Sequence, residues 1–249
     1  MSARPDPQSF DRLAADYDRF ASLEPPRVLD WLVRQLPAHG RVALDAGCGA
    51  GRHTLALASQ FDQVVGVDIS ESLIDIARRR SRQNVRYHVI DLMSFTDVDG
   101  FDLVFSSTTL HHLPDLDAAL LHLRRLVRAG GMAVLIDNVA SRPTPPRWVH
   151  VLGAVRQYPT DVGRLGWPQA RWLLKFRTSA QWLDHLASDR YLSRRAFERR
   201  YEAIFPGGRF HELGYARGLV WRNAGPVPAR RGKENPAADA RGHEVRREP

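Results

Sequence analysis

An acidic residue followed by three regularly spaced glycines is the strongest chemical signal in the sequence. Asp45 ends an apolar run and precedes Gly47, Gly49 and Gly51 in the stretch VALDAGCGAGR. Glycine permits a tight turn and close approach of a ligand to bare backbone, and a following helix presents unpaired N–H groups. A dinucleotide fingerprint would need glycine at position 52, where the sequence has Arg52. The carboxylate of Asp45 suits a ligand's ammonium group better than a pyrophosphate.

Two further apolar runs end in aspartates of the kind that bind a nucleoside. Asp68 follows the β-branched run VVGV, and Asp91 follows the run HVI. An acid in the position of Asp68 can accept hydrogen bonds from both hydroxyls of a ribose. Ile69 could pack on a purine face, and Asp91 could accept an exocyclic amine. Three consecutive strands that each end in Asp predict a nucleoside site extended by a zwitterionic group.

Strands that alternate with helices must position these residues. The pattern predicts strands over residues 42–46, 63–69, 85–90, 101–106 and 132–139. It predicts helices over 9–22, 26–36, 51–60, 70–81 and 116–127, the last ended by Gly130 and Gly131. Such alternation is typical of a mostly parallel α/β sheet, and the continuously apolar strands fit a sheet covered on both faces. A helix over 193–205 and short strands over 210–216 and 218–223 predict a closing antiparallel hairpin.

A long insertion follows the fifth strand. Residues 141–192 exceed the usual loop length and hold four of the six tryptophans: Trp148, Trp167, Trp172 and Trp182. An insertion at the carboxyl end of a strand lies where α/β sheets bind ligands. We therefore expect a helical substrate cap over 141–192, N-terminal lid helices over 1–40, a cofactor-binding core over 41–140, and the last helix and hairpin of the core over 193–223.

Composition and charge exclude several classes of protein. The 249 residues are 43% hydrophobic and 26% charged, as in an ordinary globular chain, and the net charge is +8. Much of the positive excess lies in 141–192, which weakens a general argument for nucleic-acid binding. No apolar run is long enough for a membrane span, and the single Cys48 excludes an internal disulfide or a cysteine-based zinc site. Without a secretory signal, we expect a cytoplasmic location, and the polar residues 224–249 are predicted to be disordered.

Taken together, these motifs resemble class I S-adenosylmethionine (SAM)-dependent methyltransferases. LDAGCGAG is similar to the first motif of that family, VVGVDIS to the second and VIDL to the adenine-contacting third. FDLVFSSTTLHHLPD and VRAGGMAVLID resemble the segments at the fourth and fifth strands. The resemblance covers roughly residues 11–137 and the last helix and hairpin. It implies an α/β, Rossmann-like sheet of seven strands in the order 3-2-1-4-5-7-6, with strand 7 antiparallel.

The resemblance also implies a role for each matched position. SAM would be bound, and S-adenosylhomocysteine (SAH) released, by a set of cofactor-binding residues: Tyr17, Asp45, Gly47, Gly49, Gly51, Asp68, Ile69, Asp91, Leu92 and Ser106. Within this set, Asp68 would hold the ribose and Ser106 would lie under the methionine moiety. Tyr17, in ADYDRF, resembles a lid residue that reaches the cofactor carboxylate.

Two histidines follow the fourth strand near the place where the methyl group should point. His111 is predicted to be the general base, although either histidine could instead orient the loop. His112, Trp148 and Trp172 are predicted to contact the acceptor. The sequence has no pair of cysteines and no His-x-His or His-Glu-x-x-His spacing, so no metal is expected.

Three functions remain open at this stage. We favour a methyltransferase that acts on a small organic acceptor in natural-product metabolism, working as a monomer or homodimer, with no membrane or nucleic-acid partner. A methyltransferase that acts on RNA or protein through the Arg-rich cap is disfavoured, because SSTT lacks the Asn/Asp-Pro-Pro-Tyr pattern of enzymes that methylate amino groups of nucleic acids. The third possibility is a SAM-binding protein without transfer activity.

Overall fold

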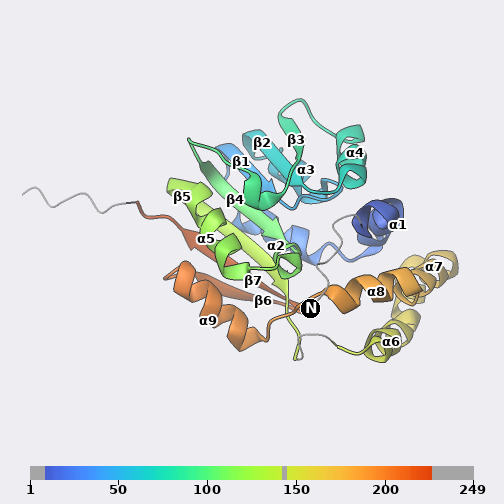
Figure 1. Ribbon diagram of the computed structural model, residues 1–249. Helices are drawn as coiled ribbons and strands as arrows, with labels where there is room; N and C mark the ends of the chain where they lie inside the picture. Colours follow the sequence, from blue (N-terminus) through green and yellow to red (C-terminus); the bar gives the residue numbers. More distant parts are fainter. Residues whose placement is uncertain (1–8, 142–144, 226–249) are drawn as a thin grey trace, which may run out of the picture.

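The computed structural model describes residues 9–141 and 145–225, which form a seven-stranded sheet with helices on both faces (Figure 1). The strand order is β3-β2-β1-β4-β5-β7-β6, and β7 runs antiparallel to β5 and β6. This confirms the predicted order. The strands are β1 (Gly40–Ala46), β2 (Phe61–Asp68), β3 (Val85–Val89), β4 (Phe101–Ser107), β5 (Val127–Asn138), β6 (Arg209–Leu213) and β7 (Ala216–Arg222). Most of the predicted disordered tail, from residue 226 on, lies outside the described residues, as do residues 1–8 of the predicted lid.

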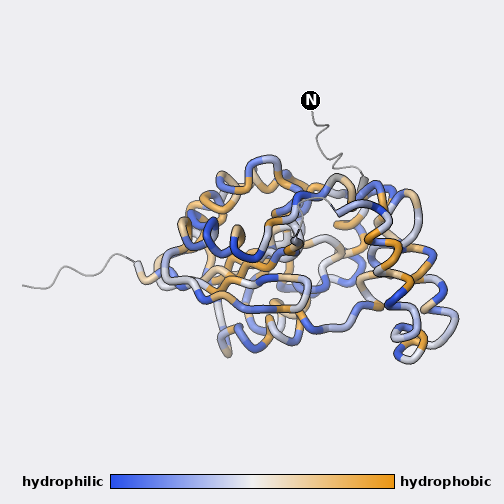
Figure 2. Tube along the Cα trace, turned by 90° about the horizontal axis from the view of Figure 1, so that it is seen from below, coloured by the Kyte–Doolittle hydropathy of each residue, from blue (hydrophilic) through white to orange (hydrophobic). Residues whose placement is uncertain are grey.

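Alternate residues of the strands pack into two hydrophobic cores, one on each face of the sheet. In β5, Ala133 and Leu135 pack with helices α5 (Leu116–Leu126) and α9 (Arg194–Ile204), whereas Val134 and Ile136 pack on the other face. That second face is covered by α2 (Arg27–Gln35), α3 (Arg52–Leu57) and α4 (Glu71–Arg79). Side chains of a strand point to opposite faces in turn, so a strand buried on both faces must be apolar throughout. Figure 2 shows apolar residues along the strands and polar residues on outer helical turns.

Short polar side chains fix where several helices begin. The hydroxyl of Ser70 accepts the N–H of Leu73, the carboxylate of Asp115 accepts the N–H of Ala118, and Ser193 does the same for Ala196. These bonds satisfy N–H groups that lack a partner within the helix. The cap at Ser70 also binds α1 (Ser9–Leu23), because its hydroxyl donates to the carboxylate of Asp11 over 2.5 Å. The lid helix is therefore attached beside the end of β2.

Two boundaries differ from the sequence-based expectation. Gly130 and Gly131 do not end α5; they lie within β5, where the pairing with β4 is irregular between Phe101 and Leu103. A Cβ on Gly131 would lie only 2.8 Å from the carbonyl oxygen of Phe101, so glycine is needed for this close approach. The last hairpin turns at Gly214, which has φ +78°, and β7 starts at Ala216.

The insertion folds into three helices: α6 (Arg147–Leu165), α7 (Trp167–Arg177) and α8 (Ala180–Ser188). They lie together beside α1 (Figure 1), where Phe20 of α1 packs on Phe176 and Trp182. Arg177 joins the same elements by pairing with Glu24 and with the buried carboxylate of Asp161. Lid and cap thus form one packed unit over the sheet. Within the described ranges, no helix combines the length and apolar character needed to cross a membrane.

Candidate functional site

The glycine loop joins β1 to α3 in a conformation that side chains would not allow. Gly47 and Gly51 have φ values of +75° and +78°. A Cβ on Gly47 would collide with the side chain of Thr109, and one on Gly51 would collide with the hydroxyl of Tyr87. Gly49 is also left-handed, but a Cβ there would meet nothing closer than 4.0 Å. The loop is therefore tightly packed from behind and open at Gly49, as a surface for a ligand would be.

Asp45 lies beneath this loop and is 1% exposed. The hydroxyl of Thr54 on α3 donates to its Oδ2 over 2.6 Å. Burial raises the pKa of the Asp45 carboxyl to about 7; the Thr54 hydrogen bond acts against this rise, and the negative charge of Asp68 adds to it. Asp45 therefore connects the end of β1 to α3 through Thr54, beneath the glycine loop where the cofactor is predicted to bind.

Asp68 fixes the glycine loop against the end of β2. Its Oδ2 accepts the N–H of Gly49 over 2.8 Å, and its Oδ1 accepts the N–H of Ser70 over 2.9 Å. A carboxylate has about four lone-pair sites, so both oxygens can still accept a hydroxyl. Burial raises the pKa of Asp68, and the two backbone hydrogen bonds oppose the shift.

The neighbouring positions leave an apolar surface beside this carboxylate. Ile69 is 46% exposed, Leu92 is buried, and Asp91, at the end of β3, is exposed. Asp91 also begins a short 3₁₀ turn, η1 (Leu92–Ser94), by accepting the N–H of Met93. The carboxyl ends of β1, β2 and β3 therefore bring the three predicted aspartates to one edge of the sheet.

Two predicted cofactor residues occupy different surroundings. Ser106 is fully buried, and its hydroxyl donates to the carbonyl oxygen of Ala46 over 2.8 Å. It joins β4 to β1, while the next residues, Ser107 and Thr108, line the cavity described below. Tyr17 of the lid helix faces that cavity. Burial, followed by the charge of Asp68, raises the pKa of Tyr17 to about 12, so its hydroxyl is a neutral donor.

A cavity of about 500 Å³ lies between the sheet, the lid helix and the cap. Its walls come from all three parts: Arg52 and Thr108 of the core, Tyr17 and Phe20 of the lid, and Trp182 of the cap. Its polar lining residues include Ser107 and Thr108 at the end of β4 and Asn138 at the end of β5. The cavity runs from Arg52, directly after the glycine loop, to the inner surface of the cap. Tyr17 is the one predicted cofactor residue that lines it among the described residues, whereas the three glycines and the aspartates at the strand ends lie outside its lining.

Arg52 is a candidate binding residue that the sequence analysis did not assign. It is the first residue of α3, it lines the cavity, and its Nη1 is buried without a hydrogen-bond partner among the described residues. Burial lowers the pKa of Arg52, while the charge of Asp18 opposes the shift. A buried donor without an acceptor is costly, so this nitrogen suits a carboxylate of a ligand. The sequence could have indicated Arg52 as a binding residue, because it follows the glycine loop directly.

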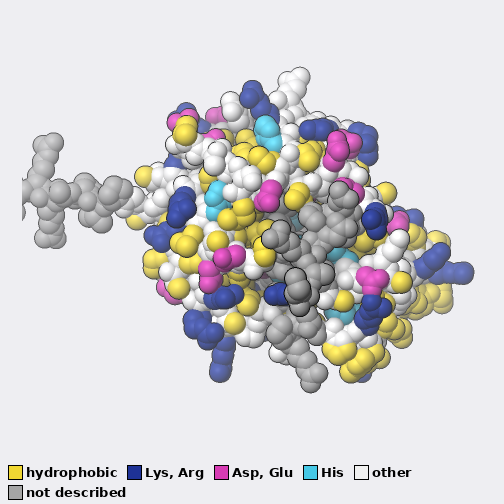
Figure 3. All heavy atoms as spheres, viewed as in Figure 1, with side chains coloured by type: hydrophobic (Ala, Val, Ile, Leu, Met, Phe, Trp, Pro, Cys, Tyr) yellow, Lys and Arg dark blue, Asp and Glu magenta, His cyan; other side chains and the backbone are white. Residues whose placement is uncertain are grey.

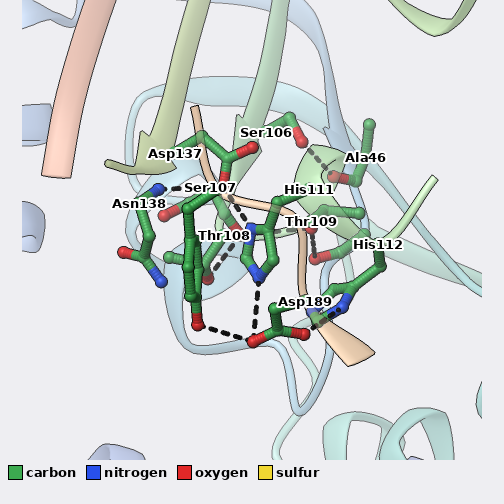
Figure 4. A network of polar contacts seen from close by, with 12 residues as sticks. Ala46, Ser106, Ser107, Thr108, Thr109, His111, His112, Asp137, Asn138 and Asp189 are labelled. Carbon is green, nitrogen blue, oxygen red and sulfur yellow. Dashed lines mark hydrogen bonds and ion pairs between the residues drawn. The ribbon is translucent and has the colours of Figure 1, made fainter. Parts of the chain in front are cut away.

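A cluster of histidines and aspartates, which we call the His–Asp cluster, lies where the ends of β4 and β5 meet the end of the cap (Figure 4). It consists of His111, His112, Asp137, Asp189 and Tyr191. His111 Nδ1 bonds Asp137 Oδ1, while its Nε2 lies 3.8 Å from Asp189 Oδ2. His112 Nδ1 lies 3.0 Å from Asp189 Oδ1, and the hydroxyl of Tyr191 donates to Asp189 Oδ2 over 2.6 Å.

Burial and charge act in opposite directions in this cluster. Burial lowers the pKa of His111, but the carboxylates of Asp137 and Asp189 outweigh it, so the net pKa is raised. Burial favours a raised pKa for Asp189, but its contacts with His112 and His111 hold the pKa below the ordinary value. The sequence analysis did not name Asp137 as a site residue, although its position at the carboxyl end of β5 could have indicated one. Nothing in the local pattern singles out Asp189, which lies in the insertion.

The predicted acceptor contacts at Trp148 and Trp172 are not supported by this geometry. Trp148 is 65% exposed. The part of the surface where the cap lies shows apolar side chains with Lys and Arg among them (Figure 3). Trp172 stacks on Phe176 and carries the guanidinium of Arg19 over its ring. Neither tryptophan is among the residues that line the cavity, because α6 turns other residues, such as His150 and Ala154, toward it.

Comparisons with known proteins identify relatives of part of this chain. Residues 44–135 match a family model described as a methyltransferase domain. The chain is 36% identical over 110 residues to a ubiquinone biosynthesis O-methyltransferase of Coxiella burnetii. This match covers 43% of this chain and 47% of that protein. It is 33% identical over 120 residues to the O-methyltransferase cnsE of Penicillium expansum, over 45% of this chain and 44% of that protein. The chain thus spans about half the length of these curated relatives.

A solved structure extends the likeness beyond the matched domain. The DhpI–SAH complex has a TM-score of 0.60 and 20% sequence identity, over 90% of this chain and 100% of that one. At this level of identity the likeness concerns the fold. It includes most of the described helices and strands outside residues 44–135.

Proposed function

We propose that the protein is a class I SAM-dependent methyltransferase that methylates a hydroxyl group of a small organic acceptor held under the cap, since residues 44–135 match a model of a methyltransferase domain. The observation that carries this proposal is the continuous cavity from Arg52 and Tyr17 to the His–Asp cluster. The names of the curated relatives, which are O-methyltransferases, favour oxygen as the methylated atom. An acceptor from natural-product metabolism, a cytoplasmic location and a monomeric or dimeric state stay predictions.

The residues at the strand ends fit SAM and its product SAH. Asp68 can accept the ribose hydroxyls, and the exposed face of Ile69 can pack on adenine next to Asp91 and Leu92. The open backbone at Gly49 and the unpartnered Nη1 of Arg52 suit the amino-acid part of the ligand. When bound, SAM supplies a methyl group on a cationic sulfur, with a neutral thioether as the leaving group.

The main task of the chain is therefore to align the acceptor and exclude water. Phe10 and Tyr17 of the lid and Trp182 of the cap close the cavity with aromatic side chains. Aromatic faces also stabilise a nearby cation. Because the lid helix packs on α7 and α8 through Phe20, a movement of the cap that admits the acceptor would also move the lid.

We infer that His111 activates the hydroxyl of the acceptor. Its contact with Asp137 holds Nδ1, which leaves Nε2 on the side of Asp189 and the cavity. A histidine oriented in this way by a carboxylate is a common arrangement for acting on a hydroxyl. His112, one residue later, lines the same wall and would contact the acceptor.

The proposal is tested by measuring SAH formation with a panel of phenols and alcohols, together with SAH binding by calorimetry. We expect SAH to bind and at least one hydroxyl acceptor to be methylated. His111→Ala should lower turnover much more than SAH affinity. Absence of SAH and SAM binding would refute the proposal. Binding without transfer to any acceptor would favour a non-catalytic SAM-binding protein, and methylation of RNA with a steep salt dependence would favour the nucleic-acid alternative.

A further inference from the structure

We propose that His111, His112 and Asp189 bind a divalent transition-metal ion such as Zn²⁺, which activates the acceptor hydroxyl. The existence of the site depends on the geometry of these three side chains, while its role in activation rests on the proposed function. His111 would then act as a ligand of the ion rather than as a free base. The first two residues come from the turn after β4, and Asp189 comes from the end of the cap.

The three side chains are arranged as ligands of one ion. One atom of each lies within 4.8 Å of the other two. The separations are 3.0 Å between His112 Nδ1 and Asp189 Oδ1, and 3.8 Å between His111 Nε2 and Asp189 Oδ2. Zinc binds nitrogen and oxygen at about 2.0–2.2 Å in tetrahedral geometry, so two of its ligands lie about 3.4 Å apart. The two observed separations lie on either side of that value, and small side-chain adjustments would fit both.

The neighbouring groups prepare the ligand atoms for a cation. Asp137 engages Nδ1 of His111, which leaves the Nε2 lone pair for the ion. A carboxylate bound to the other ring nitrogen commonly orients a histidine that ligates a metal. Tyr191 orients the Asp189 carboxylate by donating to Oδ2.

The buried carboxylate of Asp189 requires a cationic or hydrogen-bonding partner. Asp189 is only 1% exposed, and its Oδ1 lies 3.0 Å from Nδ1 of His112, where a proton on the imidazole or a bound cation would join the two atoms. Leaving a buried carboxylate oxygen without a hydrogen bond is costly. A cation between the two atoms would satisfy this oxygen and use the lone pair of His112.

Two imidazoles and one carboxylate are typical of a catalytic site for zinc or a similar ion. Structural zinc sites have four protein ligands, whereas catalytic sites have three and keep a position for substrate or water. Imidazole also favours transition metals over Mg²⁺ or Ca²⁺. Here all three ligands line the cavity under the cap, so the remaining position would face the acceptor.

Such an ion would lower the pKa of a hydroxyl bound to it, as it does for water. The acceptor hydroxyl would release its proton to solvent. A lone pair of the resulting oxygen anion would form the O–C bond while the C–S bond breaks, with its electron pair left on the sulfur of SAH. No oxidant or reductant is needed. Because Asp189 belongs to the cap, the ion would also hold the cap against the sheet.

The test is a titration of chelator-treated protein with Co²⁺, whose visible absorption reports tetrahedral coordination. We expect a single high-affinity ion per chain, displaced by Zn²⁺. Asp189→Asn and His112→Gln should abolish this binding, and Asp137→Asn should weaken it about 10–100-fold through the second shell. His53→Gln is the matched control, because His53 lines the same cavity outside the ligand set and should leave Co²⁺ binding unchanged. Circular dichroism and SAH calorimetry show whether each variant is folded.

Failure to bind Co²⁺ in the wild-type protein would overturn the proposal, and this outcome does not depend on the folding of any variant. Binding that survives both ligand substitutions would also overturn it, because the ion would then lie elsewhere. The proposed function fails separately. Binding of Co²⁺ without SAH affinity would leave the metal site standing, whereas full methylation by metal-free protein would leave the function standing and refute a role for the ion.

Discussion

Arg52 offers the sharpest test of how the glycine loop binds its ligand. Arg52 lines the cavity, its Nη1 is buried without a hydrogen-bond partner among the described residues, and we expect its guanidinium to meet the carboxylate of SAM or SAH. Arg52→Met keeps much of the aliphatic length and removes the charged donors. Since α3 begins at this residue, the substitution changes the polar end of a helix whose packing is carried by Leu57 and Thr54.

The expected magnitude follows from the type of bond. A hydrogen bond to a charged group contributes about 1.5–3 kcal/mol, which corresponds to about a 10–150-fold change in Kd. Arg52 is only half-buried, and solvent screens part of this interaction, so we expect the lower part of that range for SAH. The protein without ligand should be at least as stable as the wild type, because the substitution removes a buried donor that has no acceptor.

The assay is calorimetry with two ligands. SAH carries the amino-acid carboxylate, whereas 5′-methylthioadenosine has the same nucleoside and lacks that group. Arg52→Met should weaken SAH and leave methylthioadenosine unchanged. Arg199→Met, at an exposed position on α9, is the control and should alter neither affinity. An equal loss for both ligands, or no loss for SAH, would refute the reasoning.

Three further predictions concern the same loop. Asp68→Ala should weaken SAH and methylthioadenosine alike, by about 1.5–3 kcal/mol or more, because the carboxylate serves the ribose; calorimetry that finds unchanged affinities would remove this assignment. Burial raises the pKa of Asp45 from 3.8 to about 7, so the folded state favours its neutral form. Its contribution to the unfolding free energy should therefore be largest in acid. As the pH rises from 3.8 to about 7, that contribution should fall by up to about 1.4 kcal/mol per pH unit, with no further change at higher pH. Asp45→Asn should remove this pH dependence in urea titrations at several pH values. Gly51→Ala should cost about 1–2 kcal/mol for its left-handed φ alone and more for the contact with Tyr87, whereas Gly49→Ala should cost less because nothing crowds it; equal urea midpoints for the two variants would contradict this packing.

Local patterns carried much of the information about the sheet and the ligand-binding edge. The apolar runs that end at Asp45 and Asp68 are short, and each is followed by a helix whose start the sequence marks with glycine or serine. Since parallel strands all end at one edge, such a pattern places these side chains together before any contact is known. The order of the last strands depended on the family resemblance, because hairpins alone do not specify which strand β7 joins.

The cap shows where local patterns fail. Its four tryptophans suggested an aromatic pocket, but only the tertiary packing decides which face of each helix meets the cavity, so Trp148 turns outward while Trp182 turns in. In β5, the close approach of Phe101 decides that Gly130 and Gly131 form an irregular strand rather than a helix end.

The sequence by itself determined the alternation of strands and helices, the acidic strand ends and the glycine loop, because each depends on neighbours a few residues apart. Only the tertiary structure brought Asp189 to His111 and His112, and only it buried one nitrogen of Arg52 without a hydrogen-bond partner among the described residues. These features depend on how the cap folds back over the sheet. Contacts between residues so distant in the chain arise from the packing of whole elements, which no local periodicity records.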